Sequence, residues 1–156
     1  MASDMKTAEQ ILQEKGGQLY SVAEDATVLE ALRLMVESKV GSILIKEGSR
    51  VVGIYTERDL MRNTIDADFD PASTAIGQVM TRGLRFAPYS DTAFELMDKF
   101  LGLRLRHLLI ERNDEFIGML SIGDVVRSAL RERTHELEAL QEVVNWEYYE
   151  EWKPRQ

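Results

Sequence analysis

The sequence predicts a mixed α/β (α+β) fold in which a small β-α-β-β-α unit occurs twice. The first observation is a repeated pattern, Gly-x-x-(Ser/Thr)-x-x-Asp, found at Gly53–Asp59 and again 65 residues later at Gly118–Asp124. The second is a helical apolar pattern followed by two short apolar runs around each copy. The third is the length of 156 residues, which suits two small halves that share one core better than two independent domains.

The first copy supplies each element of the unit in order. Thr27 and Glu30 stand three residues apart, a capping-box signature at the start of an amphipathic helix. A turn that contains Gly48 joins the two predicted strands into a hairpin. The expected elements are a short helix at 9–12, an extended segment at 19–21, a helix at 28–36, strands at 42–45 and 51–55, and a helix from Thr56 to about Ile65.

The second copy repeats this order, and its last helix is predicted to run on. No Gly or Pro occurs from Asp124 to about Glu150, and apolar residues recur there at helical spacing. The expected elements are a helical segment at 77–80, an extended segment at 84–86, a helix from Thr92, strands at 107–110 and 116–120, and a long helix from Ser121. The predicted organisation is a first repeat at 8–66, a linker at 67–75, a second repeat at 76–130 and a C-terminal helical extension at 131–156.

The composition narrows the class of protein. Hydrophobic residues make up 44% of the chain, which is enough for a globular core. The sequence contains no run of 18 apolar residues, so it predicts no membrane-spanning helix. The N-terminus is polar and cysteine is absent, so we expect a cytoplasmic protein without disulfides or thiol chemistry. A net charge of −8, with no long basic stripe, disfavours nucleic acid as a partner.

The repeated hydroxyl and carboxylate are the candidate functional groups. Thr56 and Asp59, and likewise Ser121 and Asp124, occupy the N-cap and N3 positions of a predicted helix. Capping and a favourable first-turn charge would alone account for these residue types. Helix capping does not explain the preceding Gly or the position at the carboxyl end of a strand, where α/β folds leave ligand crevices. The helix N-terminus at this position would also favour an anion.

The order of elements and the two motif endings resemble a tandem pair of cystathionine β-synthase (CBS) domains, together a Bateman module, over residues 8 to about 130. The resemblance implies a stand-alone CBS-domain protein whose two repeats pack about a pseudo-two-fold axis and form two clefts for adenosine ligands. The family often has proline within the first hairpin strand, where this chain has Leu44 and Leu109. Leucine extends a strand more readily than proline, so we expect the fold to be unaffected.

By the family's geometry, each cleft combines the Ser/Thr-Asp pair of one repeat with residues of the other. One site would comprise Thr56, Asp59, Leu84, Arg85, Arg106 and His107. The other would comprise Ser121, Asp124, Tyr20, Gly41 and Ser42.

The two predicted sites differ in charge. Arg106 and His107 offer charge-assisted hydrogen bonds to a phosphate, whereas the equivalent Gly41 and Ser42 offer none. Arg58, beside Asp59, would add another cation, so the site with Asp59 is predicted to bind phosphate more tightly. The alternative for His107 is a partly buried strand residue with a satisfied hydrogen bond, and the alternative for Arg106 is a solvated strand edge.

The sequence predicts a binding module rather than an enzyme. His107 and His135 are the only histidines, and no nucleophile elbow, P-loop or dinucleotide fingerprint is present. We therefore expect no catalytic residue, no metal and no required cofactor. The expected ligand is AMP first, then ADP, ATP, NAD or an S-adenosyl compound, with a shift in the conformation of a homodimer as the response. The alternative is an interaction protein with vestigial clefts that acts through its acidic, aromatic C-terminal helix on a partner that the sequence does not identify.

Overall fold

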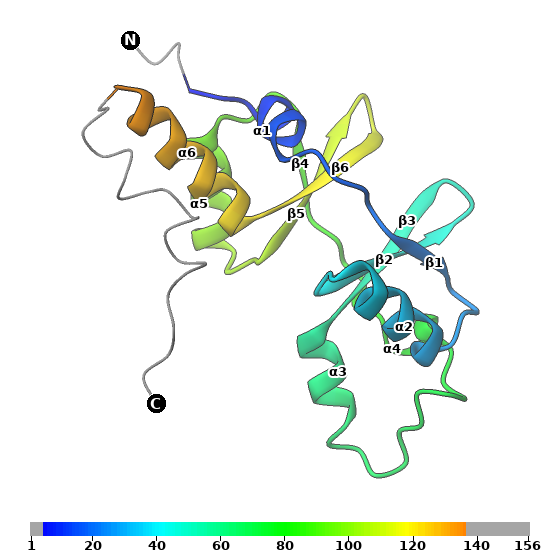
Figure 1. The fold of residues 1–156 in the computed structure, drawn as a ribbon. Helices are drawn as coiled ribbons and strands as arrows, with labels where there is room; N and C mark the ends of the chain where they lie inside the picture. The colour runs from blue at the N-terminus through cyan, green and yellow to red at the C-terminus, as the bar shows by residue number, and fades with distance from the viewer. Residues whose placement is uncertain (1–4, 137–156) are drawn as a thin grey trace, which may run out of the picture. The chain divides into compact units, whose positions relative to one another are not determined.

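The computed structural model describes residues 5–136, with side chains as far as residue 132, and confirms the mixed α+β fold (Figure 1). Both copies contain the predicted strand, helix, hairpin and second helix. The elements are α1 (Ala8–Lys15), β1 (Ser21–Ala23), α2 (Val28–Ser38), β2 (Ser42–Glu47), β3 (Arg50–Thr56), α3 (Glu57–Asn63), α4 (Ile76–Val79), β4 (Phe86–Pro88), α5 (Ala93–Gly102), β5 (His107–Arg112), β6 (Glu115–Ser121) and α6 (Ile122–Glu136).

Each copy forms its own three-stranded sheet, in the order β1-β2-β3 and β4-β5-β6. In the first sheet β1 runs parallel to β2, and β2 pairs antiparallel with β3. Ser42 lies opposite Thr56 in this register, so the start of β2 stands beside the hydroxyl that ends β3. Leu44 and Leu109 are buried strand residues, which confirms that the absence of proline leaves the fold unaffected.

Capping boxes begin α2 and α5, as the sequence predicts. Thr27 Oγ1 accepts from the Glu30 N–H at 3.1 Å, and a Glu30 carboxylate oxygen accepts from the Thr27 N–H at 2.9 Å. Thr92 and Glu95 repeat this arrangement at the start of α5. Two donors at each helix start are thereby satisfied, which fixes where each crossover helix begins.

The described chain forms two compact units. Unit 1 contains residues 5–15, 87–110 and 119–136, and unit 2 contains residues 16–86 and 111–118. Unit 2 is built on a core of side chains from α2, β2, β3 and the α4 segment. The buried members are Val28, Ala31, Met35, Ile43, Ile45, Tyr55, Ile76 and Met80.

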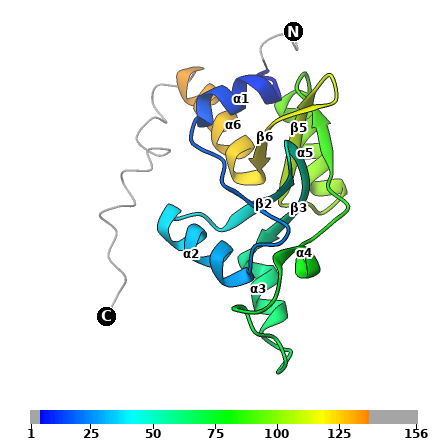
Figure 2. The ribbon, with the colours of Figure 1, turned by 90° about the vertical axis from the view of Figure 1, so that its right-hand side faces the viewer.

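Unit 1 is built on β4, β5, β6, α5 and α6, and its core also takes in α1. Ala8 and Ile11 of α1 are buried there with Leu96 and Phe100 of α5 and Val125 of α6. In both views of the ribbon α1 (blue) lies beside α6 (yellow to orange) (Figures 1 and 2). The helix that precedes the first copy therefore packs on the core of the second, just as α4, which precedes the second copy, packs on the core of the first.

The last described helix, α6, ends at Glu136. It agrees with the prediction of a helix that continues past the second motif, while the predicted continuation to about residue 150 lies outside the described residues. No helix within residues 5–136 combines the length and apolarity needed to cross a bilayer.

Candidate ligand-binding sites

The first candidate site is the carboxylate of Asp59 at the start of α3. Thr56 ends β3 and caps α3, so that its hydroxyl accepts from the Asp59 N–H at 3.3 Å. Asp59 Oδ2 accepts from the Thr56 N–H at 2.9 Å and from the Thr56 hydroxyl at 3.0 Å. The side chain of Asp59 is only 13% exposed. The carboxylate is therefore held in one orientation by its own helix start.

The other oxygen of Asp59 has weaker partners within the described chain. Oδ1 accepts from the Thr81 hydroxyl at 3.3 Å, and a guanidinium nitrogen of Arg62 lies 4.0 Å away. Thr81 reaches this place because its backbone pairs with Ile54 of β3, with N···O distances of 2.9 and 3.1 Å. A carboxylate offers about four acceptor positions, so Asp59 retains capacity for a ligand donor.

The structure brings several predicted residues of unit 2 close to this carboxylate. Gly41 O accepts from the Glu57 N–H at 3.1 Å, and Ser42 pairs with Thr56 across the sheet. Leu84 follows Thr81 by three residues and lines a cavity of about 910 Å³ together with Arg50, Arg82, Phe86 and Phe116. Arg58 and Arg85 are exposed, and Tyr20 is half-buried against the unit 2 core.

The second candidate site is the carboxylate of Asp124 at the start of α6, which repeats the local geometry of the first. Asp124 Oδ2 accepts from the Ser121 N–H at 2.7 Å, and Ser121 Oγ accepts from the Asp124 N–H at 3.2 Å. The Asp124 side chain is 10% exposed. The predicted pairing of hydroxyl and carboxylate at a helix start is therefore present in both copies.

Two cations surround Asp124. Lys15 Nζ lies 2.9 Å from Oδ2 and also donates to the carbonyl of Met119 at 3.0 Å, while Arg127 lies 3.1 Å from Oδ1. Although burial alone would raise the pKa of Asp124, hydrogen bonds from the Ser121 N–H and from Lys15 hold it below its usual range. Sequence reasoning missed Lys15, because nothing in the sequence signals that α1 packs beside the second copy's motif.

Arg106 and His107 lie in unit 1, at the approach to β5 and at its first residue. The Arg106 carbonyl accepts from the Ile122 N–H at 3.3 Å, which sets this strand start beside the start of α6. Burial lowers the pKa of His107, and the positive charge of Lys15 lowers it further, while the charge of Asp124 opposes both. The lowered pKa favours the neutral form of the His107 imidazole, and the residue belongs to the electrostatic surroundings of Asp124.

Each unit thus assembles a motif carboxylate with its own neighbours. Unit 2 holds Asp59 with Gly41 and Ser42 beside the start of its helix, and unit 1 holds Asp124 with Arg106 and His107. The predicted pairing of Asp59 with Arg106 and His107, and of Asp124 with Tyr20, Gly41 and Ser42, joins residues of different units and stays a prediction. Among the described residues no group of three His, Cys, Asp or Glu side chains is arranged to hold a metal ion.

The comparisons with known proteins agree with this fold and motif. The family model of the CBS domain matches residues 9–66 and 76–131, so the chain belongs to the CBS domain family. It is 30% identical over 151 residues to the mitochondrial CBS domain-containing protein CBSX3 of Arabidopsis thaliana, an alignment that covers 91% of this chain and 73% of that protein. The chain spans only 21% of the length of another relative, CBSCBSPB2 of the same plant.

Solved structures share the architecture. The CBS-domain protein ATU1752 of Agrobacterium tumefaciens matches with a TM-score of 0.72 and 28% identity over 80% of this chain and 99% of that one. The structure of CBSX2 in complex with AMP matches with a TM-score of 0.65 and 25% identity, over 81% and 98% of the two chains. The second of these is a CBS-domain protein with a bound adenine nucleotide.

Proposed function

We propose that this protein is a non-catalytic regulatory module that binds an adenosine ligand, with AMP as the first candidate. The observation that carries the proposal is the repeated carboxylate, Asp59 in one copy and Asp124 in the other, fixed by hydrogen bonds at the end of a strand and the start of a helix. Membership of the CBS family and the AMP complex of CBSX2 support a ligand of this class. ADP, ATP, NAD and S-adenosyl compounds remain the further candidates.

The chemistry assigned to the motif is recognition of ribose. Asp59 Oδ2 is taken up by Thr56, which leaves Oδ1 facing only the Thr81 hydroxyl and the distant Arg62 within the described chain. A ribose 2′- or 3′-hydroxyl would donate to Asp59 Oδ1, either in place of the Thr81 hydroxyl or beside it. Such hydrogen bonds contribute about 1.5–3 kcal/mol each. Leu84 would pack on the base, and Arg58 and Arg85 would lie at the exposed edge.

Phosphate recognition is assigned to Arg106 and His107, which the resemblance to the family would place in one site with Thr56 and Asp59. The same resemblance would place Tyr20, Gly41 and Ser42 in the other site, with Ser121 and Asp124. Arg106 would contact the phosphate through its guanidinium group, and His107 would donate a ring N–H to it. Burial lowers the pKa of His107 and so favours its neutral form before a ligand binds.

The regulatory response is assigned to a homodimer whose conformation the ligand shifts. Helix faces in both units leave large apolar side chains exposed. Val36 on α2 is 77% exposed, and Phe94 and Leu101 on α5 are 67% and 65% exposed. Two-fold dimers are the commonest way to cover such faces. Light scattering of the full chain at micromolar concentration tests this assignment, and a monomer would contradict it.

The location and the division of the chain remain proposals as well. We assign repeat 1 to residues 8–66, the linker to 67–75, repeat 2 to 76–130 and the extension to 131–156. A cytoplasmic location is proposed from the sequence, although the relative CBSX3 carries the word mitochondrial in its name. Microscopy of the tagged chain in cells distinguishes a cytoplasmic from a mitochondrial location.

Calorimetry with AMP and adenosine tests the proposed function. Asp59→Ala and Asp124→Ala should each weaken or abolish one binding event, by roughly 1.5–3 kcal/mol, because each removes a charged acceptor for ribose. Asp59→Asn removes the charge but retains a side-chain oxygen for the Thr56 N–H at the start of α3, so it distinguishes loss of binding from loss of the fold.

Asp68→Ala is the matched control, since Asp68 is an exposed linker carboxylate. It should leave binding unchanged. Equal AMP affinity in wild type, Asp59→Ala and Asp124→Ala would overturn the assignment. Failure of every adenosine ligand to bind the wild-type chain would favour the alternative of an interaction protein with vestigial clefts.

A further inference from the structure

A small cavity of about 250 Å³ lies between α1 and α6 in unit 1, and the motif carboxylate Asp124 forms part of its wall. The cavity is rich in cations, although the chain as a whole carries a net charge of −8. Three basic and two acidic side chains line it. The lining residues are Ile11, Glu14, Lys15, Asp124, Arg127, Ser128 and Arg131.

The two carboxylates of this cavity are already compensated. Glu14 accepts from the Ser128 hydroxyl at 3.1 Å and forms an ion pair with Lys6. Asp124 pairs with Lys15 at 2.9 Å and with Arg127 at 3.1 Å. The third cation, Arg131, is exposed and interacts electrostatically with Glu14, which Lys6 already neutralises. Positive charge therefore exceeds negative charge around the cavity.

Lys15 has donor capacity beyond the contacts it makes. Its ammonium group carries three N–H bonds, and its contacts with Asp124 Oδ2 and the Met119 carbonyl use two of them. A phosphate oxygen would take the third as a charge-assisted hydrogen bond. The planar guanidinium of Arg131 suits the same kind of ligand.

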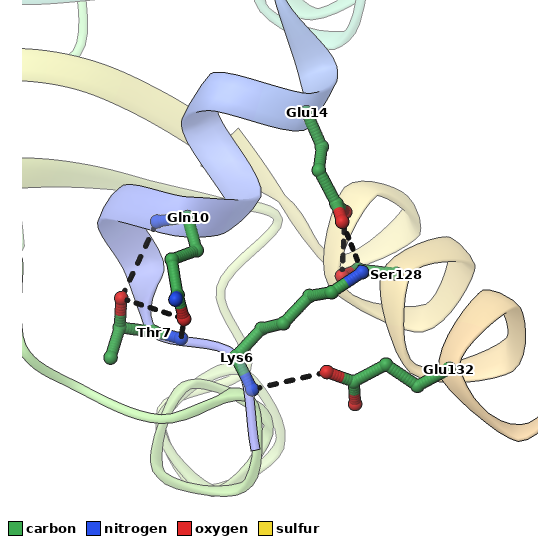
Figure 3. A network of polar contacts seen from close by, with 6 residues as sticks. All are labelled: Lys6, Thr7, Gln10, Glu14, Ser128 and Glu132. Carbon is green, nitrogen blue, oxygen red and sulfur yellow. Dashed lines mark hydrogen bonds and ion pairs between the residues drawn. The ribbon is translucent and has the colours of Figure 1, made fainter. Parts of the chain in front are cut away.

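The lysine is held in place by the packing of its helix. Positions 124, 128 and 132 follow one face of α6, and they contact Lys15, the Glu14 carboxylate and the Lys6 backbone N–H of the α1 segment. Figure 3 shows two of these contacts, Glu14 with Ser128 and the Lys6 backbone N–H with Glu132. A cation fixed in this way loses little conformational freedom when it binds a ligand.

Within residues 5–136, the ion-pair partner of the other carboxylate, Asp59, is an arginine rather than a lysine. The lead-in segment of the second copy presents the neutral hydroxyl of Thr81 to Asp59, at 3.3 Å. Arg62, which corresponds to Arg127, is 4.0 Å from Asp59 and largely exposed. The two carboxylates are similarly buried, so the difference between the sites is one of charge.

We propose that Lys15, Arg127 and Arg131 form an anion subsite beside Asp124 that receives the phosphate of an adenosine ligand. Lys15 is then a specificity-determining residue, and the site at Asp124 discriminates AMP from adenosine through it. This inference rests on the proposed function. The phosphate contacts assigned to Arg106 and His107 belong to the site with Asp59, whereas Lys15, a cation that the sequence did not suggest, would give the Asp124 site a phosphate preference of its own.

The test measures AMP and adenosine binding by calorimetry in an Asp59→Asn background, which isolates the site at Asp124. Lys15→Met should weaken AMP by ~10-fold or more, because it removes a charge-assisted bond, and should leave adenosine nearly unchanged. Arg131→Gln should weaken AMP in the same direction by a smaller factor. Arg131 is exposed, so this variant keeps the test informative if Lys15→Met fails to fold. Arg33→Gln, an exposed charge on α2 outside the cavity, is the matched control.

Three results would overturn the inference. An unchanged ratio of AMP to adenosine affinity in both variants would show that these cations do not contact phosphate. Equal weakening of AMP and adenosine by Lys15→Met would show that Lys15 only positions Asp124. If neither ligand binds the wild-type chain, the proposed function fails and the inference fails with it, a result that the first two cannot produce.

Discussion

Asp59 and Asp124 occupy the same position in the two copies of one motif, yet their surroundings differ. Both accept a backbone N–H from the residue that caps their helix, at 2.9 and 2.7 Å. Asp59 then meets the Thr81 hydroxyl, whereas Asp124 meets the Lys15 ammonium. Repetition of the sequence fixes the geometry of the carboxylate, and a residue outside the repeated motif sets the charge around it.

The difference originates in the segments that lead into the copies. These segments begin alike. The Ala8 N–H donates to the carbonyl of Asp91 at 2.7 Å, and the Ile76 N–H donates to the carbonyl of Ala26 at 2.8 Å. The two acceptors, Ala26 and Asp91, are equivalent positions of the two copies, 65 residues apart. The two segments then diverge, because α1 has eight residues and α4 has four. The longer helix carries Lys15 to Asp124, while the shorter one ends before Met80 and Thr81. The difference between the surroundings of the two carboxylates therefore originates in the least similar parts of the repeat.

The largest expected effect concerns Gly53, the first residue of the motif in unit 2. A Cβ at Gly53 would lie 2.3 Å from Met80 Sδ and 3.2 Å from Met80 Cβ, so the lead-in segment packs directly on this glycine. Gly53→Ala should destabilise the chain by about 1–3 kcal/mol through overpacking. Met80→Ala should cost about 2–5 kcal/mol, because Met80 is buried. Urea unfolding measures both.

The double variant sharpens this interpretation. If Gly53 is required because Met80 covers it, Gly53→Ala with Met80→Ala should cost less than the two single changes added together, since the new methyl group occupies vacated space. Gly102→Ala is the matched control, because a Cβ at Gly102 meets nothing within 4 Å. Strict additivity would show that contact with Met80 is not the reason why Gly53→Ala destabilises the chain.

The second effect concerns Tyr55, which lies where the other copy has Leu120. Its hydroxyl donates to Asn63 Oδ1 at 2.7 Å, and burial, with the charge of Asp59 adding to it, raises the pKa of Tyr55 to about 12. An unfolded tyrosine ionises near pH 10. The contribution of Tyr55 to the free energy of unfolding should therefore be constant below pH 10 and should fall between pH 10 and 12, by at most about 2–3 kcal/mol.

Urea unfolding across this alkaline range, together with the absorbance of tyrosinate, measures the contribution of Tyr55. Tyr55→Phe should remove its part of the alkaline loss, at a cost of about 1 kcal/mol for the hydrogen bond to Asn63. Tyr89→Phe is the control, since Tyr89 is exposed. An unchanged alkaline profile in Tyr55→Phe would refute the raised pKa and with it this distinction between the copies.

The local features of both copies could be predicted from the sequence, because each depends on neighbours within a few residues. The capping boxes at Thr27 and Thr92 and the motif pairs at Thr56 and Ser121 are of this kind. The contacts that distinguish the sites could not be predicted in this way. Lys15 reaches Asp124 across 109 positions of sequence, and Met80 reaches Gly53 across 27. Both contacts depend on which core a lead-in helix joins, and the repeat pattern carries no signal for that choice.

The smallest expected effect compares the two carboxylates through their lead-in partners. Lys15→Met should destabilise the chain by about 1 kcal/mol, because it removes one of two cations from a mostly buried carboxylate. Thr81→Val should cost about half as much or less, since its hydrogen bond to Asp59 is long and exposed.

The variants also differ in how their stability depends on pH. The lowered pKa of Asp124 contributes stability that is present above the ordinary Asp value and is lost as the pH falls through the folded pKa. In Lys15→Met the pKa of Asp124 should rise, so that part of this acid-sensitive contribution disappears. Carboxyl NMR titration reports that pKa directly, with Lys39→Met, an exposed lysine at the end of α2, as the control. If Asp124 titrates unchanged in Lys15→Met, then Arg127 and the Ser121 N–H hold its charge alone, and the electrostatic difference between the two copies is smaller than the contact at 2.9 Å implies.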